Sequence, residues 1–181
     1  MKRVLIGLMV AAVAAIGFGG GVASASAPKL QTFGTGTVTV MGADSATIVN
    51  GTGEYGGVYL NSKSQSGKPL NAVSFSFVST GDVTGGAPRF SIPIDTDGIG
   101  STVEGYAFLD VLGCGGVTGA TTTVSTDLSS CQVSFNSPNY NYANWDAFAA
   151  ANPTYRISPG AIPFIIADEP GSYAVNSIDL R

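Results

Sequence analysis

The sequence contains no histidine, only 2 cysteines and a single tryptophan among its 181 residues. Catalysis by a Ser-His-Asp or Cys-His system needs an imidazole that changes charge near neutral pH, so the lack of histidine excludes it. It also excludes zinc, copper and non-haem iron sites with histidine ligands, and two thiols are too few for an all-cysteine tetrahedral centre. Transition-metal chemistry is therefore outside the expected functions.

Charged residues are also scarce, at 11% of the chain, and acidic residues outnumber basic ones by 12 to 8. Nucleic acids and anionic membrane surfaces are bound through clustered Lys and Arg side chains. We therefore expect neither as a partner. Hydrophobic residues make up 44% of the chain, which is enough to bury the core of one globular domain.

The N-terminal segment has the pattern of a secretory signal peptide. Lys2 and Arg3 precede an apolar run over residues 4–18, and small residues follow around Ala25. The run is shorter than the ~20 residues of a spanning helix, which disfavours the alternative of a retained anchor. We expect a signal peptide over residues 1–25 and a single mature domain over residues 26–181, with a net charge of about −6. This domain is expected to be secreted, extracellular or at the cell surface, with no membrane association after cleavage.

The two cysteines, Cys114 and Cys131, are predicted to form a disulfide, because export to an oxidising compartment favours pairing. The alternative, a redox-active pair, lacks the C-x-x-C spacing that lowers a thiol pKa. The Gly-, Thr- and Ser-rich residues 113–130 then form a long excursion tethered by this bond.

Short segments rich in β-branched and aromatic residues recur between turn signals, which indicates an all-β chain. The clearest alternation places Val73, Phe75 and Phe77 on one face of a strand. About ten strands are predicted in total. They cover residues 35–41, 46–50, 57–61, 72–78, 89–94, 105–111, 132–135, 154–158, 163–167 and 172–180.

One helix is predicted, over residues 145–151. Asn144 can cap its first turn, and the residue before Pro153 is disfavoured in the α region. Trp145, Phe148 and Ala149 share one face, which predicts that the helix docks onto a sheet. Many short strands with one small helix favour a two-sheet antiparallel β-sandwich of the jelly-roll type.

Acidic residues gather between positions 95 and 110. Asp95 and Asp97 lie on an Asp-Thr-Asp-Gly turn, and Glu104 or Asp110 can return from the next strand to complete a set of oxygen ligands for a structural Ca²⁺ ion. The alternative is a solvated hairpin turn without a metal. The same four acids also permit a small glycoside hydrolase, which uses a pair of carboxyl groups.

Aromatic rings and amides alternate over residues 135–145. Tyr140, Tyr142 and Trp145 are the candidate ligand-binding residues, because rings stack on sugars while amides bond to hydroxyls. The alternative places Trp145 in the core and both tyrosines over the end of the sandwich. Arg89 forms either a salt bridge or a contact to a ligand carboxylate.

Several of these segments resemble secreted bacterial jelly-roll modules, broadly similar to carbohydrate-binding or galactose-binding-like domains. The resemblance covers residues 70–181 and rests on a G-G-x-P-R-F strand start at residues 85–90, the Asp-x-Asp-Gly turn, an aromatic strand, Y-x-x-W at 142–145 and the closing strand at 177–180. It implies a non-catalytic sandwich with a structural calcium ion and a glycan-binding face, and it assigns no residue roles.

Together these patterns predict a secreted, non-catalytic β-sandwich protein that acts as a binding or cell-surface structural component. The first alternative is a carbohydrate-binding module, and the second is a carboxylate-dependent glycoside hydrolase. A polysaccharide or another extracellular protein is the expected partner.

Overall fold

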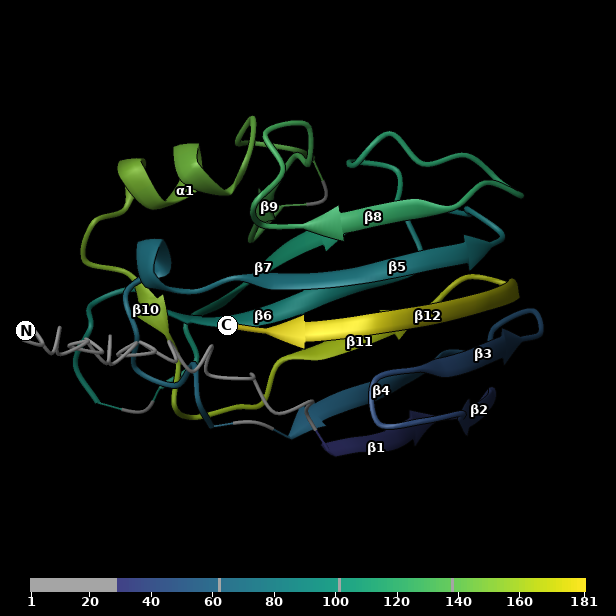
Figure 1. Cartoon of the computed structure of the whole chain (residues 1–181). Helices are drawn as coiled ribbons and strands as arrows, with labels where there is room; N and C mark the ends of the chain where they lie inside the picture. Colours follow the sequence, from purple (N-terminus) through teal and green to yellow (C-terminus); the bar gives the residue numbers. More distant parts are fainter. Residues whose placement is uncertain (1–28, 62, 101, 138) are drawn as a thin grey trace, which may run out of the picture.

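The structure is a computed structural model that describes residues 29–61, 63–100, 102–137 and 139–181. The predicted signal peptide lies outside these described residues. Within them, no helix is long and apolar enough to cross a membrane. The described chain forms two antiparallel sheets packed against each other, with a short helix beside one end of the strands (Figure 1).

Twelve described strands and two short helices make up the fold. The strands are β1 (Lys29–Gly34), β2 (Thr37–Val40), β3 (Ala46–Asn50), β4 (Gly56–Asn61), β5 (Phe75–Gly81), β6 (Arg89–Asp95), β7 (Gly105–Asp110), β8 (Thr122–Ser125), β9 (Ser134–Phe135), β10 (Arg156–Ile157), β11 (Phe164–Ala167) and β12 (Gly171–Leu180). The helices are the 3₁₀-helix η1 (Leu70–Ala72) and the α-helix α1 (Trp145–Ala151).

The strand order confirms the predicted sandwich. The larger sheet runs β1-β4-β11-β6-β7-β9, with β10 paired to β6, and the smaller sheet runs β2-β3-β12-β5-β8. Along the chain from β3 to β8 and then through β11 and β12, each strand lies in the opposite sheet from the strand before it. The one exception in this series is β7, which pairs with β6 in the larger sheet. This wiring, with sheets β3-β12-β5-β8 and β4-β11-β6-β7 at its centre, is that of a jelly roll.

Strand alternation places the core between the sheets. Phe75 and Phe77 of β5, and Phe90, Ile92 and Ile94 of β6, point inward and are fully buried, as their spacing predicts. The rings of Phe77 and Phe90 meet edge to face across the two sheets, with their centroids 4.8 Å apart. Burying one such side chain contributes roughly 1.5–3 kcal/mol, so these facing rows hold the sheets together.

Helix α1 forms over the predicted residues. The side-chain oxygen of Asn144 accepts a hydrogen bond from the backbone N–H of Ala147 at 2.9 Å, which caps the first turn. Trp145 and Phe148 are buried. The indole N–H of Trp145 donates to the carbonyl oxygen of Leu70 at 2.9 Å, so the helix docks through its apolar face onto the turn that leads into β5.

Two strands were not predicted. β8 lies inside the segment expected to be an excursion, and it pairs with β5 to form an edge of the smaller sheet. The Cys114–Cys131 disulfide, which is confirmed, therefore links the two ends of a segment that carries a sheet strand. β1 precedes the first predicted strand and pairs with β4 at the edge of the larger sheet. β1 is mostly exposed, so its sequence lacks the alternation of buried apolar residues that marks strands such as β5.

Candidate functional site

The outer face of the larger sheet carries a row of aromatic side chains. Residues paired on neighbouring antiparallel strands project on the same face. Tyr59 of β4 pairs with Phe164 of β11, and Phe164 pairs with Ser91 of β6. Ser91 in turn pairs with Phe108 of β7. The strand neighbours of these residues point into the core, so this row faces outward.

Two further rings extend the row, and we call the five side chains Phe33, Tyr59, Phe164, Tyr106 and Phe108 the aromatic face. Ring centroids lie 4.5 Å apart between Phe33 and Tyr59 and 5.8 Å apart between Tyr59 and Phe164. They lie 5.8 Å apart between Phe164 and Tyr106 and 6.3 Å apart between Tyr106 and Phe108. All five side chains are half-buried. They therefore form one contiguous apolar surface across the sheet.

Two small residues form the floor beneath these rings. A Cβ atom at Gly57 would lie 2.5 Å from Cζ of Phe33, so the Phe33 ring lies against the β4 backbone. Ser91 is only 1% exposed although it belongs to the outward row, because the rings of Phe164 and Phe108 flank it. The rings therefore cover the sheet, and their remaining apolar area is open to solvent.

An open groove of about 440 Å³ adjoins the β7 end of the aromatic face. Its lining includes Phe108, Arg89, Asp110, Ser134 and Asn136. The groove thus joins one ring of the aromatic face to a base, an acid, a hydroxyl and an amide. Sites for small ligands combine apolar walls with a few placed polar groups in this way.

Arg89 is held from two sides at the groove. Its Nη1 and Nη2 atoms donate to Oδ1 and Oδ2 of Asp168 at 2.6 and 2.5 Å, the bidentate geometry of a guanidinium–carboxylate pair. Its Cζ atom also lies 5.6 Å from the centroid of the Phe108 ring, within cation–π range. The salt-bridge alternative for Arg89 is therefore the one that the structure shows.

Asp110 is the buried acid of the groove, with 7% of the residue exposed. Its Oδ1 atom accepts hydrogen bonds from the hydroxyl of Tyr140 at 2.7 Å and from the backbone N–H of Gly113 at 2.6 Å. Burial of the phenol, followed by the hydrogen bond and charge of Asp110, raises the pKa of Tyr140 above its ordinary value of 10.0. The Tyr140 hydroxyl therefore remains a donor to Asp110 at neutral pH.

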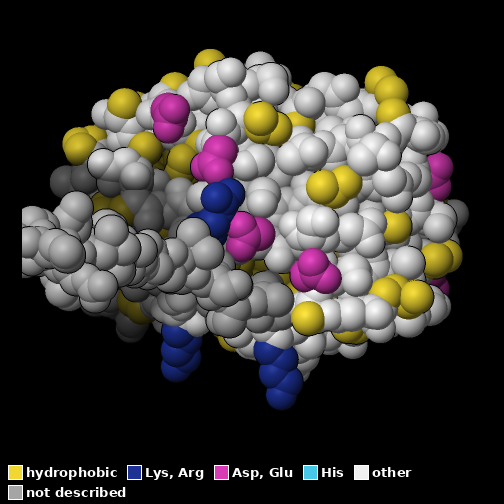
Figure 2. All heavy atoms as spheres, in the orientation of Figure 1, with side chains coloured by type: hydrophobic (Ala, Val, Ile, Leu, Met, Phe, Trp, Pro, Cys, Tyr) yellow, Lys and Arg dark blue, Asp and Glu magenta, His cyan; other side chains and the backbone are white. Residues whose placement is uncertain are grey.

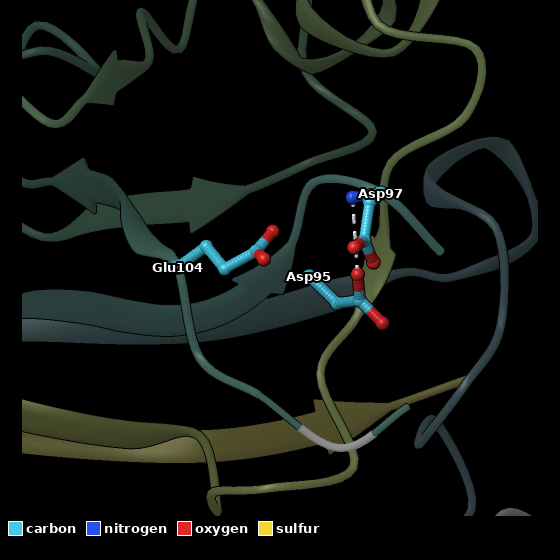
Figure 3. Close-up of side chains that lie close together, drawn as sticks. All are labelled: Asp95, Asp97 and Glu104. Carbon is cyan, nitrogen blue, oxygen red and sulfur yellow. Dashed lines mark hydrogen bonds between the residues drawn. The ribbon is translucent and has the colours of Figure 1, made fainter. Parts of the chain in front are cut away.

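Asp95, Asp97 and Glu104 come together at the other end of β6, where Figure 3 shows their side chains around one turn. One oxygen of each lies within 4.8 Å of the others, and only Asp95 is buried. Oδ1 of Asp95 accepts from the backbone N–H groups of Asp97 and Gly98 at 3.2 and 2.7 Å. Glu104 accepts from the backbone N–H of Thr96 at 2.7 Å. The carboxylates thus stabilise the turn itself, and the Ca²⁺ ion stays a prediction.

Asp110, which the sequence placed in the same calcium site, lies elsewhere. It pairs with Arg89 at the start of β6, whereas Asp95 ends that strand. At ~3.3 Å per residue, the length of β6 separates the two acids by roughly 20 Å. Asp110 is therefore excluded from the predicted site, which leaves Asp95, Asp97 and Glu104 as its candidate ligands, and Asp110 lines the groove instead.

The three predicted aromatic ligand residues occupy three different places. Trp145 is 2% exposed and belongs to the core, which corrects its assignment to a sugar-stacking surface. The ring of Tyr142 packs against that of Phe148 with centroids 4.9 Å apart, so it covers the end of the sandwich. Tyr140 reaches the groove through its hydrogen bond to Asp110.

The rings of the aromatic face are not among the ligand-binding residues predicted from the sequence. A signal is present in β7, where Tyr106 and Phe108 alternate with the buried residues Ala107 and Leu109. Apolar residues at both alternating positions indicate a strand with two apolar faces. The signal shows that the outer face is apolar, but it does not show which strands carry the neighbouring rings.

No family model, curated protein or solved structure matches the chain. The chemistry of the surface is therefore the guide to function. The rings offer flat apolar area, Arg89 offers N–H donors held in one plane, and Asp110 offers a carboxylate oxygen. Such a surface can bind a ligand that has both apolar faces and hydrogen-bonding edges.

Proposed function

We propose that the chain is a secreted, non-catalytic binding module that holds a polysaccharide on the aromatic face and in the adjoining groove. The observation that carries this proposal is the row of five touching rings, linked by ring contacts from Phe33 to Phe108, that leads directly into a groove with fixed polar groups.

The chemistry of a sugar chain fits this combination. A pyranose ring has apolar C–H faces and a rim of hydroxyl groups, so it can stack on an aromatic ring and donate or accept hydrogen bonds at its edge. Aromatic side chains contribute a large apolar contact area with few rotatable bonds. A row of rings that crosses several strands suits an extended polymer better than a compact ligand.

The carboxylates considered for hydrolysis lie away from this surface or are already engaged. A glycoside hydrolase needs two carboxyl groups on either side of one bond. Asp95, Asp97 and Glu104 lie together in the turn at the far end of β6, roughly 20 Å from Asp110, whose Oδ1 atom accepts hydrogen bonds from Tyr140 and Gly113. These contacts support a binding role rather than a catalytic one.

Affinity electrophoresis and co-sedimentation of the mature chain with a panel of soluble and insoluble polysaccharides test the proposal. Phe164 is the residue to substitute, because its ring contacts Phe33, Tyr59 and Tyr106. We expect Phe164→Ala to weaken retention at least about tenfold, or about 1.4 kcal/mol. Thr47→Ala, on the outer face of the smaller sheet, is the matched control and should bind like the wild type.

Two results would contradict the proposal. Retention of the folded wild type by no polysaccharide in the panel would contradict it. Equal retention of wild type and a folded Phe164→Ala variant would show that any sugar binding occurs elsewhere. Sedimentation velocity on the same samples would reveal the competing outcome, in which the aromatic face joins two copies of the chain.

A further inference from the structure

The carboxylate of Asp110 differs from an ordinary surface acid in how its two oxygens are used. Tyr140 and Gly113 both donate to the same oxygen, Oδ1. Oδ2 is therefore the oxygen that a ligand would meet in the groove. Because the group is nearly buried and already oriented, a ligand hydroxyl that donates to Oδ2 finds the acceptor in place without further ordering.

The charges around the groove are unfavourable for an anion. Arg89 is the basic residue of the lining, and its guanidinium already binds both oxygens of Asp168. Asp110 adds a second carboxylate directly opposite Arg89 in the strand register. Two acids therefore face one base. An anionic ligand would have to approach Asp110 without a free cation to compensate, and like-charge juxtaposition of this kind discriminates strongly against a ligand.

We propose that the groove selects neutral glycans over acidic ones, with Asp110 as the specificity-determining residue whose Oδ2 atom accepts hydrogen bonds from ligand hydroxyl groups. This inference rests on the proposed function and names the ligand class of the same surface. The rings of the aromatic face supply stacking to either class of glycan. Asp110 supplies the discrimination, because hydrogen bonds to a charged acceptor are roughly twice as strong as neutral ones and a carboxylate repels another carboxylate.

Tyr140 acts as a positioning residue in this arrangement. Its ring packs beside Gly113, where a Cβ atom would lie 2.7 Å from Cε1 of the ring, and its hydroxyl holds Oδ1 of Asp110. Loss of the hydroxyl would leave Gly113 as the remaining donor to that oxygen. Neutral-glycan binding should then weaken less than on loss of the Asp110 charge, because the acceptor remains but is less well oriented.

The experiment compares neutral and acidic polysaccharides on the same protein. Wild type is titrated by affinity electrophoresis with a neutral β-glucan, a neutral galactomannan, polygalacturonate and alginate. Asp110→Asn keeps an oxygen for Tyr140 and Gly113 and places an NH₂ donor where Oδ2 was. Asp97→Asn makes the same change of charge at the exposed turn and is the matched control. Thermal unfolding verifies that each variant is folded.

We expect wild type to bind at least one neutral glycan and to bind both acidic polymers at least about tenfold more weakly. Asp110→Asn should lower the neutral-to-acidic affinity ratio by about tenfold or more, whereas Asp97→Asn should leave it unchanged. A purely structural role of Asp110 would weaken all ligands together and leave that ratio intact.

Each outcome separates this inference from the proposed function. Retention by acidic polymers that equals or exceeds retention by neutral ones would overturn the selectivity, while polysaccharide binding itself would stand. A folded Asp110→Asn variant with an unchanged ratio would overturn the role of Asp110. If that variant does not fold, the wild-type comparison still decides the selectivity. Binding to no glycan would contradict the proposed function, and the inference would fall with it.

Discussion

The two outer faces of the sandwich carry different side chains on the same strand geometry. On the smaller sheet, cross-strand pairs such as Thr39 with Thr47 and Ala174 with Thr80 place small residues in rows. The corresponding row of the larger sheet pairs Tyr59 with Phe164. Figure 2 looks onto the smaller sheet, which lies in front in Figure 1, and shows hydrophobic side chains scattered singly over that face.

The difference separates what folding needs from what a ligand needs. Both sheets contribute inner-face residues to the main core, and threonine and serine on the smaller sheet show that the fold does not require rings on an outer face. β-Branched residues suit a pleated, solvent-facing surface. Rings that are only half-buried on the larger sheet leave apolar area for contact, and contiguous apolar patches mark interaction surfaces. The larger sheet is therefore the better candidate for the proposed binding face.

The largest expected effect comes from giving the larger sheet the surface of the smaller one. In the double variant Tyr106→Thr and Phe164→Thr, two adjacent rings are replaced by the residue typical of the other face. We expect polysaccharide retention to fall at least about 100-fold, or about 2.7 kcal/mol, because stacking area is lost at the centre of the row. Affinity electrophoresis measures the change.

The double variant Thr47→Ala and Thr80→Ala, which changes two outward residues of the smaller sheet, is the control for this experiment. Circular dichroism and thermal unfolding establish that both doubles are folded. Equal polysaccharide retention by the two double variants would contradict the prediction, because the two outer faces would then contribute equally to binding.

The second prediction concerns the floor of the aromatic face. In Gly57→Ala, the new Cβ would lie 2.3 Å from the carbonyl oxygen of Ile165 and 2.5 Å from Cζ of Phe33. Both the backbone and the ring must move, so we expect a loss of about 1–3 kcal/mol in the free energy of unfolding. Urea denaturation measures it. Gly51→Ala is the control, since its nearest neighbour is Oε2 of Glu54 at 3.3 Å, and a loss as large there would show that the floor has no special role.

The sequence predicted much of the fold because local signals agree with the tertiary contacts. In β5, alternation alone identifies Phe75 and Phe77 as core residues, and Asn144 marks the start of the helix through its capping chemistry. β8 escaped prediction because it lies within a Gly- and Thr-rich loop, and its place in the sheet depends on pairing with β5. That pairing is a long-range contact that composition does not reveal.

The candidate site was less predictable for a similar reason. Phe33, Tyr59, Phe164 and Phe108 come from four strands, and only the register of the larger sheet brings them together. The aromatic segment near Tyr140 attracted attention because its rings are close in sequence. Trp145 shows the limit of that criterion, since its indole lies on the apolar face of α1 and is buried in the core. Proximity in sequence is a poor guide to which rings share a surface in a sandwich.

The third prediction tests whether a metal fixes the far end of β6, beyond the aromatic face. If Asp95, Asp97 and Glu104 hold a Ca²⁺ ion, the folded chain must be more stable in millimolar Ca²⁺ than in the presence of a chelator. The expected gain is about 1 kcal/mol, which corresponds to an unfolding midpoint about 2–4 °C higher. Asp97→Asn should abolish the shift and Asp110→Asn should preserve it. Identical midpoints with Ca²⁺ and with chelator would leave the cluster as a turn stabilised by its own hydrogen bonds.

The fourth prediction concerns alkaline pH at the groove. Burial and Asp110 raise the pKa of Tyr140 in the folded state above its ordinary value of 10.0. The stabilising contribution of the Tyr140 hydroxyl is therefore complete below pH 10 and is lost as the pH rises through the folded-state pKa. Tyr140→Phe has no phenol to ionise. We therefore expect wild type to be more stable than the variant at pH 8, by about 1 kcal/mol for the lost hydrogen bond. The difference should shrink in urea titrations above pH 10; a constant difference would contradict the linkage.

The smallest effect is expected on the smaller sheet, and it makes the comparison quantitative. Thr47 and Thr80 flank Ala174 in the register of that face, with no aromatic ring in the outward positions of its described strands. Truncating either threonine to alanine removes one methyl and one hydroxyl from a solvated surface. We expect each variant to change the free energy of unfolding by no more than about 0.5 kcal/mol and to retain polysaccharide like the wild type. A loss of retention in either single variant would place ligand contacts on both faces, and the aromatic rings would no longer explain binding on their own.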